Sequence, residues 1–99
     1  MYKVILIWLT VATNERFDQL EYIAQDNPLA AITQDEEIER HTELLTTQPE
    51  MGRPGRVRGT RELVISQTPF IAVYRISKQR NRIEILRVLH GAQRWPLKS

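Results

Sequence analysis

The stretch "RELVISQTPFIAVYRISKQRNRIEILRVLH", residues 61–90, decides the fold of this 99-residue chain. It is rich in the β-branched and aromatic residues that strands favour, and these residues form three segments: 61–66, 69–76 and 82–90. The two connections, 66–69 and 77–81, are short enough to be hairpin turns. We therefore predict three consecutive antiparallel strands that form a meander.

A further strand is predicted near the N-terminus, in the segment "KVILIWL" at residues 3–9. The segment is almost entirely apolar and shows no alternation, which is typical of an inner strand that is covered on both faces. It is too short to cross a membrane. No clear cleavage site follows it, so we interpret it as a strand and not as a signal peptide, and we expect the chain to be cytoplasmic.

Two amphipathic segments lie between this strand and the meander. Asn14 is a suitable N-cap for a first helix that extends to about Gln25, and Pro28 suits the first turn of a second helix that runs to roughly Thr47. Apolar residues at helical spacing predict an inner stripe on each helix: Phe17, Leu20 and Ala24 on the first, and Leu29, Ile32, Ile38 and Leu45 on the second. The short link between them predicts an antiparallel hairpin.

These elements predict one α+β domain over residues 1–99, in the order βααβββ. A two-helix antiparallel hairpin packs on a twisted, mainly antiparallel four-stranded sheet. The helices can cover only one face of that sheet, whereas strand 69–76 has apolar residues on both of its faces. We expect the second face to be closed by the C-terminal tail, with Trp95 as the plug, or by another protein.

The charges are divided between the two halves of the chain. Residues 1–50 contain three Lys/Arg and ten Asp/Glu, for a formal net charge of −7, whereas residues 51–99 contain eleven Lys/Arg and two Asp/Glu, for +9. Such segregation gives one domain an acidic side and a basic side. The basic side favours a polyanion or an acidic partner segment over a solvated surface with random charge.

The segment "GRPGRVRG" at residues 52–59 joins the second helix to the meander. It lacks the order of a nucleotide-binding P-loop and follows a helix instead of a strand, so we interpret it as a connector whose arginines are useful. The chain has no cysteine and only two histidines, of which His41 lies on the acidic helix. We therefore expect neither a metal site nor a cofactor.

The segments "MGRPGRVRGTRELVI", "FIAVYRI" and "IEILRVLHGAQRWP" resemble the RelE/ParE superfamily of type II toxin–antitoxin toxins, most closely its RelE/StbE or plasmid-stabilisation members. A weaker likeness extends upstream through "EYIAQDNPLAA", so the resemblance covers about residues 20–96. It implies the βααβββ fold. It also implies a cognate antitoxin that folds on binding, wraps the toxin in a hetero-oligomeric complex and neutralises it.

The resemblance implies one of two activities. RelE-like members cleave messenger RNA in the ribosomal A site without a metal, whereas ParE-like members inhibit DNA gyrase. The arginine that RelE-like ribonucleases carry on the middle strand corresponds here to Ile71, and their basic pair on the preceding strand is reduced to Arg61. Their C-terminal arginine and tyrosine fall near Gln93 and Trp95, with Arg94 adjacent. The substitution at Ile71 therefore favours gyrase inhibition.

The alternative is a ribosome-dependent mRNA interferase in which Arg61, Arg87 and His90 would be catalytic. His90 matches the histidine with which one ribonuclease subgroup ends its last strand, although a lone histidine at a strand end is more often structural. A degenerate member that only binds its antitoxin is a third possibility. In each case the residues expected to bind the target or the antitoxin are Arg53, Arg56, Arg58, Arg75, Arg94 and Trp95.

Overall fold

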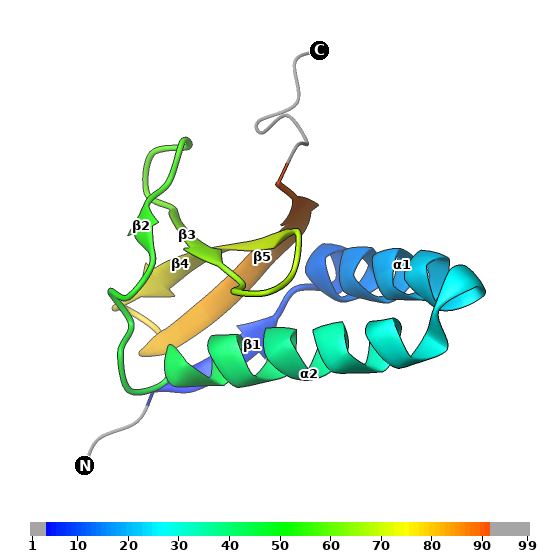
Figure 1. Cartoon of the computed structure of the whole chain (residues 1–99). Coiled ribbons are helices and arrows are strands. Elements are labelled where there is room, and N and C mark those ends of the chain that lie inside the picture. The colour runs from blue at the N-terminus through cyan, green and yellow to red at the C-terminus, as the bar shows by residue number, and fades with distance from the viewer. Residues whose placement is uncertain (1–3, 92–99) are drawn as a thin grey trace.

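A computed structural model describes residues 4–91. The helix hairpin lies under one face of the sheet, and the glycine- and arginine-rich segment rises from the other face (Figure 1). The elements in chain order are β1 (Ile5–Trp8), α1 (Thr10–Asp26), α2 (Pro28–Leu44), β2 (Arg53–Pro54), β3 (Arg61–Val64), β4 (Phe70–Ser77) and β5 (Arg82–His90). The predicted α+β class and element order are confirmed, and the short strand β2 makes the sheet five-stranded.

The strand order is β1-β5-β4-β3-β2. Strands β3, β4 and β5 form the predicted antiparallel meander, and β1 runs parallel to β5. The prediction that the N-terminal strand is an inner one is wrong, because β1 lies at the edge of the sheet and Ile5 is 63% exposed. An unbroken apolar run does not by itself say which position a strand takes in the sheet.

The helix hairpin differs from the prediction at its ends. Helix α1 begins at Thr10, and its N-cap is Leu9, whose amide still donates to the carbonyl of Ile85 in the sheet (3.0 Å). Asn14 is therefore not a cap, because the chain turns directly from β1 into the helix. Helix α2 starts at Pro28 as predicted, but it ends at Leu44. Neither helix has the length and apolar composition that a membrane span requires.

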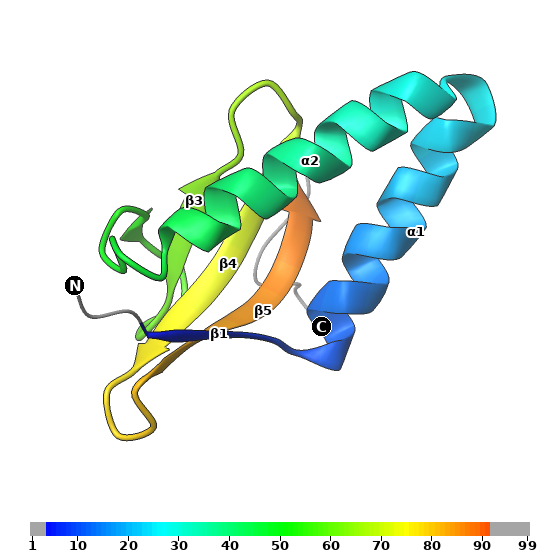
Figure 2. The ribbon, with the colours of Figure 1, turned by 90° about the horizontal axis from the view of Figure 1, so that it is seen from below.

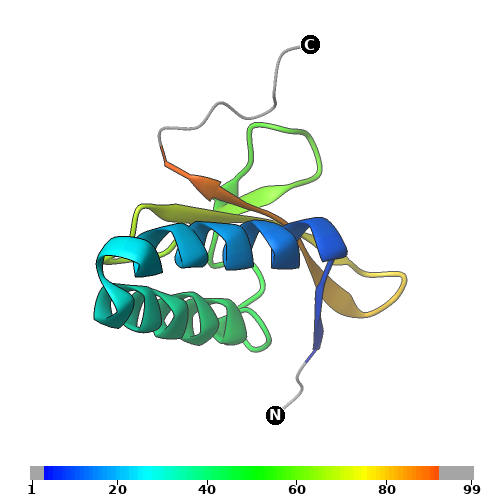
Figure 3. The same cartoon turned by 90° about the vertical axis from the view of Figure 1, so that its right-hand side faces the viewer.

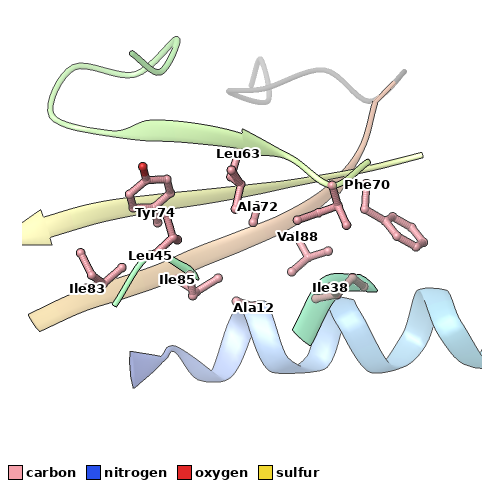
Figure 4. Close-up of a cluster of buried hydrophobic side chains, with 11 residues drawn as sticks. Ala12, Ile38, Leu45, Leu63, Phe70, Ala72, Tyr74, Ile83, Ile85 and Val88 are labelled. Atoms are coloured by element: carbon pink, nitrogen blue, oxygen red, sulfur yellow. The ribbon is translucent and has the colours of Figure 1, made fainter. Parts of the chain in front are cut away.

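The core lies between the sheet and the helices (Figure 4). Its buried members are Ala12, Ile38, Leu45, Leu63, Ile65, Phe70, Ala72, Tyr74, Ile83, Ile85 and Val88. Only part of each predicted inner stripe reaches it, since Phe17, Leu29 and Ile32 are 65%, 76% and 56% exposed. The reason is visible in Figure 2, where the distal part of the hairpin projects beyond the sheet and has no strand to pack on. Figure 3 shows that both helices lie on the same side of the sheet.

The second face of the sheet, turned away from the helices, also has buried apolar residues. Ile71, Val73 and Leu89 on β4 and β5 are each less than 9% exposed. The predicted plug Trp95 lies outside residues 4–91, so the prediction that Trp95 covers these side chains stays a prediction.

Candidate functional site

The connector after α2 is fastened to the sheet by Tyr74. The phenol of this fully buried residue donates to the carbonyl of Pro49 (2.7 Å) and accepts from the amide of Gly52 (2.9 Å). Burial raises the pKa of Tyr74, and the hydrogen bond from Gly52 offsets part of that rise. The phenol therefore stays neutral and acts as a fixed pin between α2 and β2.

Arg61 fastens the same connector from β3. Its Nε donates to the carbonyl of Gly52 (2.9 Å), and one terminal nitrogen donates to the carbonyl of Glu50 (3.1 Å). The side chain lies in register with Tyr74, on the helix side of the sheet. Arg61, which was predicted to be catalytic, thus holds the connector against the sheet through these hydrogen bonds.

The segment "GRPGRVRG" contains β2 and the turn that leads to β3, and its arginines bind a buried carboxylate on β3. Glu62 is 2% exposed, and it accepts from Arg53 (3.1 Å) and from both the side chain and the backbone amide of Arg56 (3.0 and 2.9 Å). Burial alone would raise the pKa of Glu62, but the hydrogen bonds from Arg56 and Arg53 together outweigh it and lower that pKa. Arg58 lies exposed in the same hairpin.

A second buried carboxylate lies two strands away. Glu84 on β5 is 2% exposed and accepts from the Nε atoms of Arg75 (2.5 Å) and Arg82 (2.7 Å). The hydrogen bonds from Arg75 and then Arg82 lower the pKa of Glu84, because they favour the ionised form over the effect of burial. Glu84 is therefore ionised at neutral pH.

Strand register places both carboxylates on the second face of the sheet. Glu62 pairs with Val73, and Arg75 pairs with Glu84. Val73 and Arg75 flank Tyr74, whose side chain points into the helix-side core, so both point to the opposite face. The two acidic residues of the basic half are thus buried beneath arginines, a role that the sequence analysis did not assign to them.

The C-terminal half of β5 is covered at its edge by helix α1 and not by a strand. β1 pairs only with residues 82–85 of β5. Beyond that point, Glu15 of α1 accepts from the Val88 amide (2.9 Å), and Gln19 of α1 donates to the Val88 carbonyl (2.9 Å). Glu15 also binds Arg87 with both carboxylate oxygens (3.0 and 2.9 Å from Nε), which raises the pKa of Arg87. This arrangement protects a strand edge from further pairing.

His90 ends β5 at a different place on the surface. It pairs with Phe70, and the two rings meet edge to face with centroids 6.4 Å apart. Its side chain lines a mostly apolar pocket of about 290 Å³ together with Asp18, Gln19, Tyr22, Ile23, Pro69 and Phe70.

The structure does not bring the three predicted catalytic residues together. Arg61 pairs with position 74 of β4 and His90 with position 70, which separates them by about 13 Å along the strands and by two strand spacings, or ~10 Å, across the sheet. Arg87 pairs with position 73, at the β-bulge of this strand pair, and its side chain is bound to Glu15 of α1. Within residues 4–91 no group of three or more His, Asp or Glu side chains could hold a metal ion. Arg94 and Trp95 lie outside this range.

Two similarities at the level of sequence show the family of this chain. Residues 6–95 match the model of the family described as "ParE toxin of type II toxin-antitoxin system, parDE". A protein of Sinorhizobium fredii named "Putative toxin Y4kP" is 41% identical over 88 residues, which are 88% of each chain.

Two solved structures share the fold. One belongs to a chromosomal ParDE toxin–antitoxin system of P. aeruginosa, with a TM-score of 0.80 and 24% identity over 91% of this chain and 98% of that one. The other is in the RelBE2 toxin–antitoxin complex of Mycobacterium tuberculosis, with a TM-score of 0.59 and 21% identity over 89% and 98%. With the family match and the 41% identical relative, the conclusion is that this chain belongs to the ParE toxin family of type II toxin–antitoxin systems, within the RelE/ParE superfamily.

Proposed function

We propose that this toxin arrests growth by inhibiting DNA gyrase and cleaves no RNA, as the resemblance to ParE-like members implies. The observation that carries the proposal is the separation of Arg61, Arg87 and His90. Metal-free RNA cleavage requires a base for the 2′-hydroxyl, cations for the developing phosphorane charge and an acid for the leaving oxygen, all within reach of one phosphate. These three side chains lie on different parts of the surface.

The contacts of the two arginines support the same proposal. Arg61 donates to two backbone carbonyls, and Arg87 is held by the carboxylate of Glu15. A guanidinium bound in this way would have to leave its partner before it could stabilise a phosphorane. Ile71, at the position of the ribonuclease arginine, is 8% exposed and brings no charge to the second face.

The experiment in cells is induction of the toxin without an antitoxin, compared with His90→Gln. We expect both proteins to arrest growth and to induce the DNA-damage response equally, with messenger RNA intact, because gyrase inhibition asks no proton transfer of His90. If His90 were the general acid or base of a ribonuclease, its loss would lower the cleavage rate about 10²- to 10⁴-fold. Loss of messenger RNA that disappears in His90→Gln would favour the mRNA interferase alternative.

We also propose that a cognate antitoxin neutralises the toxin by placing a helix on the projecting part of the α1–α2 hairpin. The two solved structures above come from toxin–antitoxin systems, and family membership implies such a partner here. An exposed apolar surface on a small domain marks a binding site for another protein.

The surface is a groove between the two helices. Its apolar lining is Phe17 and Leu20 with Ala24, Ala31 and Ile32, and its acidic rim is Glu21, Asp35 and Glu36. Asp35 is already bound by Arg16 (2.8 Å), which leaves Glu21 and Glu36 to attract a cationic partner. The groove therefore fits an amphipathic helix that inserts apolar side chains and carries basic residues beside them.

A further inference from the structure

The second face of the sheet carries the same charged arrangement twice. In each copy a buried glutamate accepts hydrogen bonds from two arginines that are partly exposed. We call these two sets the arginine clamps; they are Glu62 with Arg53 and Arg56, and Glu84 with Arg75 and Arg82.

Burial of an ion pair is weak evidence that the sheet needs these glutamates for its stability. An apolar residue of similar size commonly stabilises a buried position as well as a buried ion pair does, and the same face accepts Ile71 and Val73 as buried residues. What a glutamate adds is orientation. An arginine side chain has many rotamers, and a carboxylate that holds one side of its guanidinium fixes the direction of the remaining donors.

Each clamp keeps donors for a second anion. A guanidinium has five N–H groups in a planar fork. Arg75 uses its Nε on Glu84, and Arg53 uses one terminal nitrogen on Glu62. Their side chains are 53% and 56% exposed, so the other N–H groups can reach a ligand in solution. Arginine forks of this kind match phosphate oxygens in a bidentate geometry.

The spacing of the clamps suits a ligand with regularly repeated charge. Glu62 and Glu84 lie two strands apart and are offset by two residues, which places them about 12 Å from each other. Between them Val73 is fully buried, as is Leu89 nearby. The surface between the clamps thus offers charge with little apolar area, and the exposed apolar Val64 pairs with Ile71, four positions along β4 from Arg75. An acidic peptide that folds on binding needs apolar contacts to offset its loss of entropy, whereas a nucleic-acid backbone binds through charge alone.

We propose that the two arginine clamps bind the phosphate backbone of nucleic acid without reading its base sequence. The proposal requires neither gyrase nor the ribosome, so it is tested by direct binding and can fail or hold independently of the gyrase proposal. Contacts that stay on phosphates position a protein on nucleic acid but carry no sequence information.

The test uses the purified full chain and fluorescence anisotropy with a labelled 20-base-pair DNA duplex of arbitrary sequence, titrated at several salt concentrations. Four arginines on phosphates predict a slope of log K against log salt of about −3 to −4. The double variant Arg53→Gln/Arg75→Gln leaves one arginine on each glutamate, so neither carboxylate loses all of its partners. We expect it to bind at least ~10-fold more weakly and its slope to be smaller by about 2.

The matched control is Arg40→Gln, which removes a positive charge from an arginine that is 62% exposed on α2 and paired with Glu37. It should leave the slope unchanged. Circular dichroism checks the fold of each variant. If the double variant unfolds, the single variants Arg53→Gln and Arg75→Gln replace it, and each is expected to lower the slope by about 1.

An RNA probe of the same length shows which polymer supplies the phosphates. Binding to either polymer supports the proposal, and comparable binding to both indicates that the toxin recognises the phosphate backbone that DNA and RNA share. An unchanged slope in the double variant, an equal loss in Arg40→Gln, or binding to a glutamate-rich peptide but to no nucleic acid would overturn it.

Discussion

Gly52→Ala is expected to destabilise the toxin by about 2–4 kcal/mol, because it forces a side chain into a filled space and breaks a buried hydrogen bond. A Cβ atom at Gly52 would lie 2.7 Å from both Cε1 and the hydroxyl of Tyr74, and 2.9 Å from the carbonyl oxygen of Glu62. Neither neighbour can yield easily, since Tyr74 is fully buried and its hydroxyl is held by Pro49 and by the amide of Gly52 itself. For a domain of this size the melting temperature should fall by roughly 10–25 °C.

Gly59→Asn is the control for this substitution. Gly59 lies in the same segment, its added Cβ would meet nothing within 4 Å, and its φ of +85° falls in the region that asparagine tolerates best after glycine. We expect a change of less than about 1 kcal/mol. Thermal unfolding of both variants measures the difference, and equal melting temperatures would show that the connector is not pinned by Tyr74.

The second large effect is expected on antitoxin binding. Phe17→Ser/Ile32→Ser removes two exposed apolar side chains from opposite sides of the hairpin groove. Truncation of well-packed interface residues costs about 2 kcal/mol each, so the dissociation constant of the toxin–antitoxin complex should rise roughly 1,000-fold. The fold should be little affected, because both side chains are more than half exposed in the toxin alone.

Ile5→Ser is the matched control, since Ile5 is 63% exposed but lies on β1, outside the groove. Calorimetric titration of the co-expressed antitoxin after refolding gives the affinities. If Ile5→Ser weakens the complex as much as the groove variant does, the antitoxin helix does not dock on the hairpin.

The meander could be predicted from the sequence because its signals are local. The two short connections make strands that are consecutive in the chain pair with each other, so the order of the three meander strands in the sheet follows from the sequence. The edge position of β1 could not be predicted, since it depends on the pairing of β1 with β5, the last strand along the chain. The exposure of Phe17 and Ile32 could not be predicted either. Helical periodicity shows that residues share a face, but it does not show whether a sheet lies opposite that face.

The candidate site was predictable only as a set of charges. The concentration of arginines after residue 50 indicates a basic side, but their partners depend on strand register. Glu62 and Glu84 had a signal that could have been used, because each is the sole acid in a strand that also carries arginine. The pairing of Arg87 with Glu15 spans 72 residues along the chain, and nothing local in the sequence indicates it.

The most direct test of the central claim is the supercoiling activity of purified DNA gyrase on relaxed plasmid in the presence of the refolded toxin. We predict that the toxin inhibits supercoiling, that His90→Gln inhibits it equally, and that added antitoxin restores it. Full gyrase activity at toxin concentrations that produce A-site cuts in messenger RNA on programmed ribosomes would contradict the account.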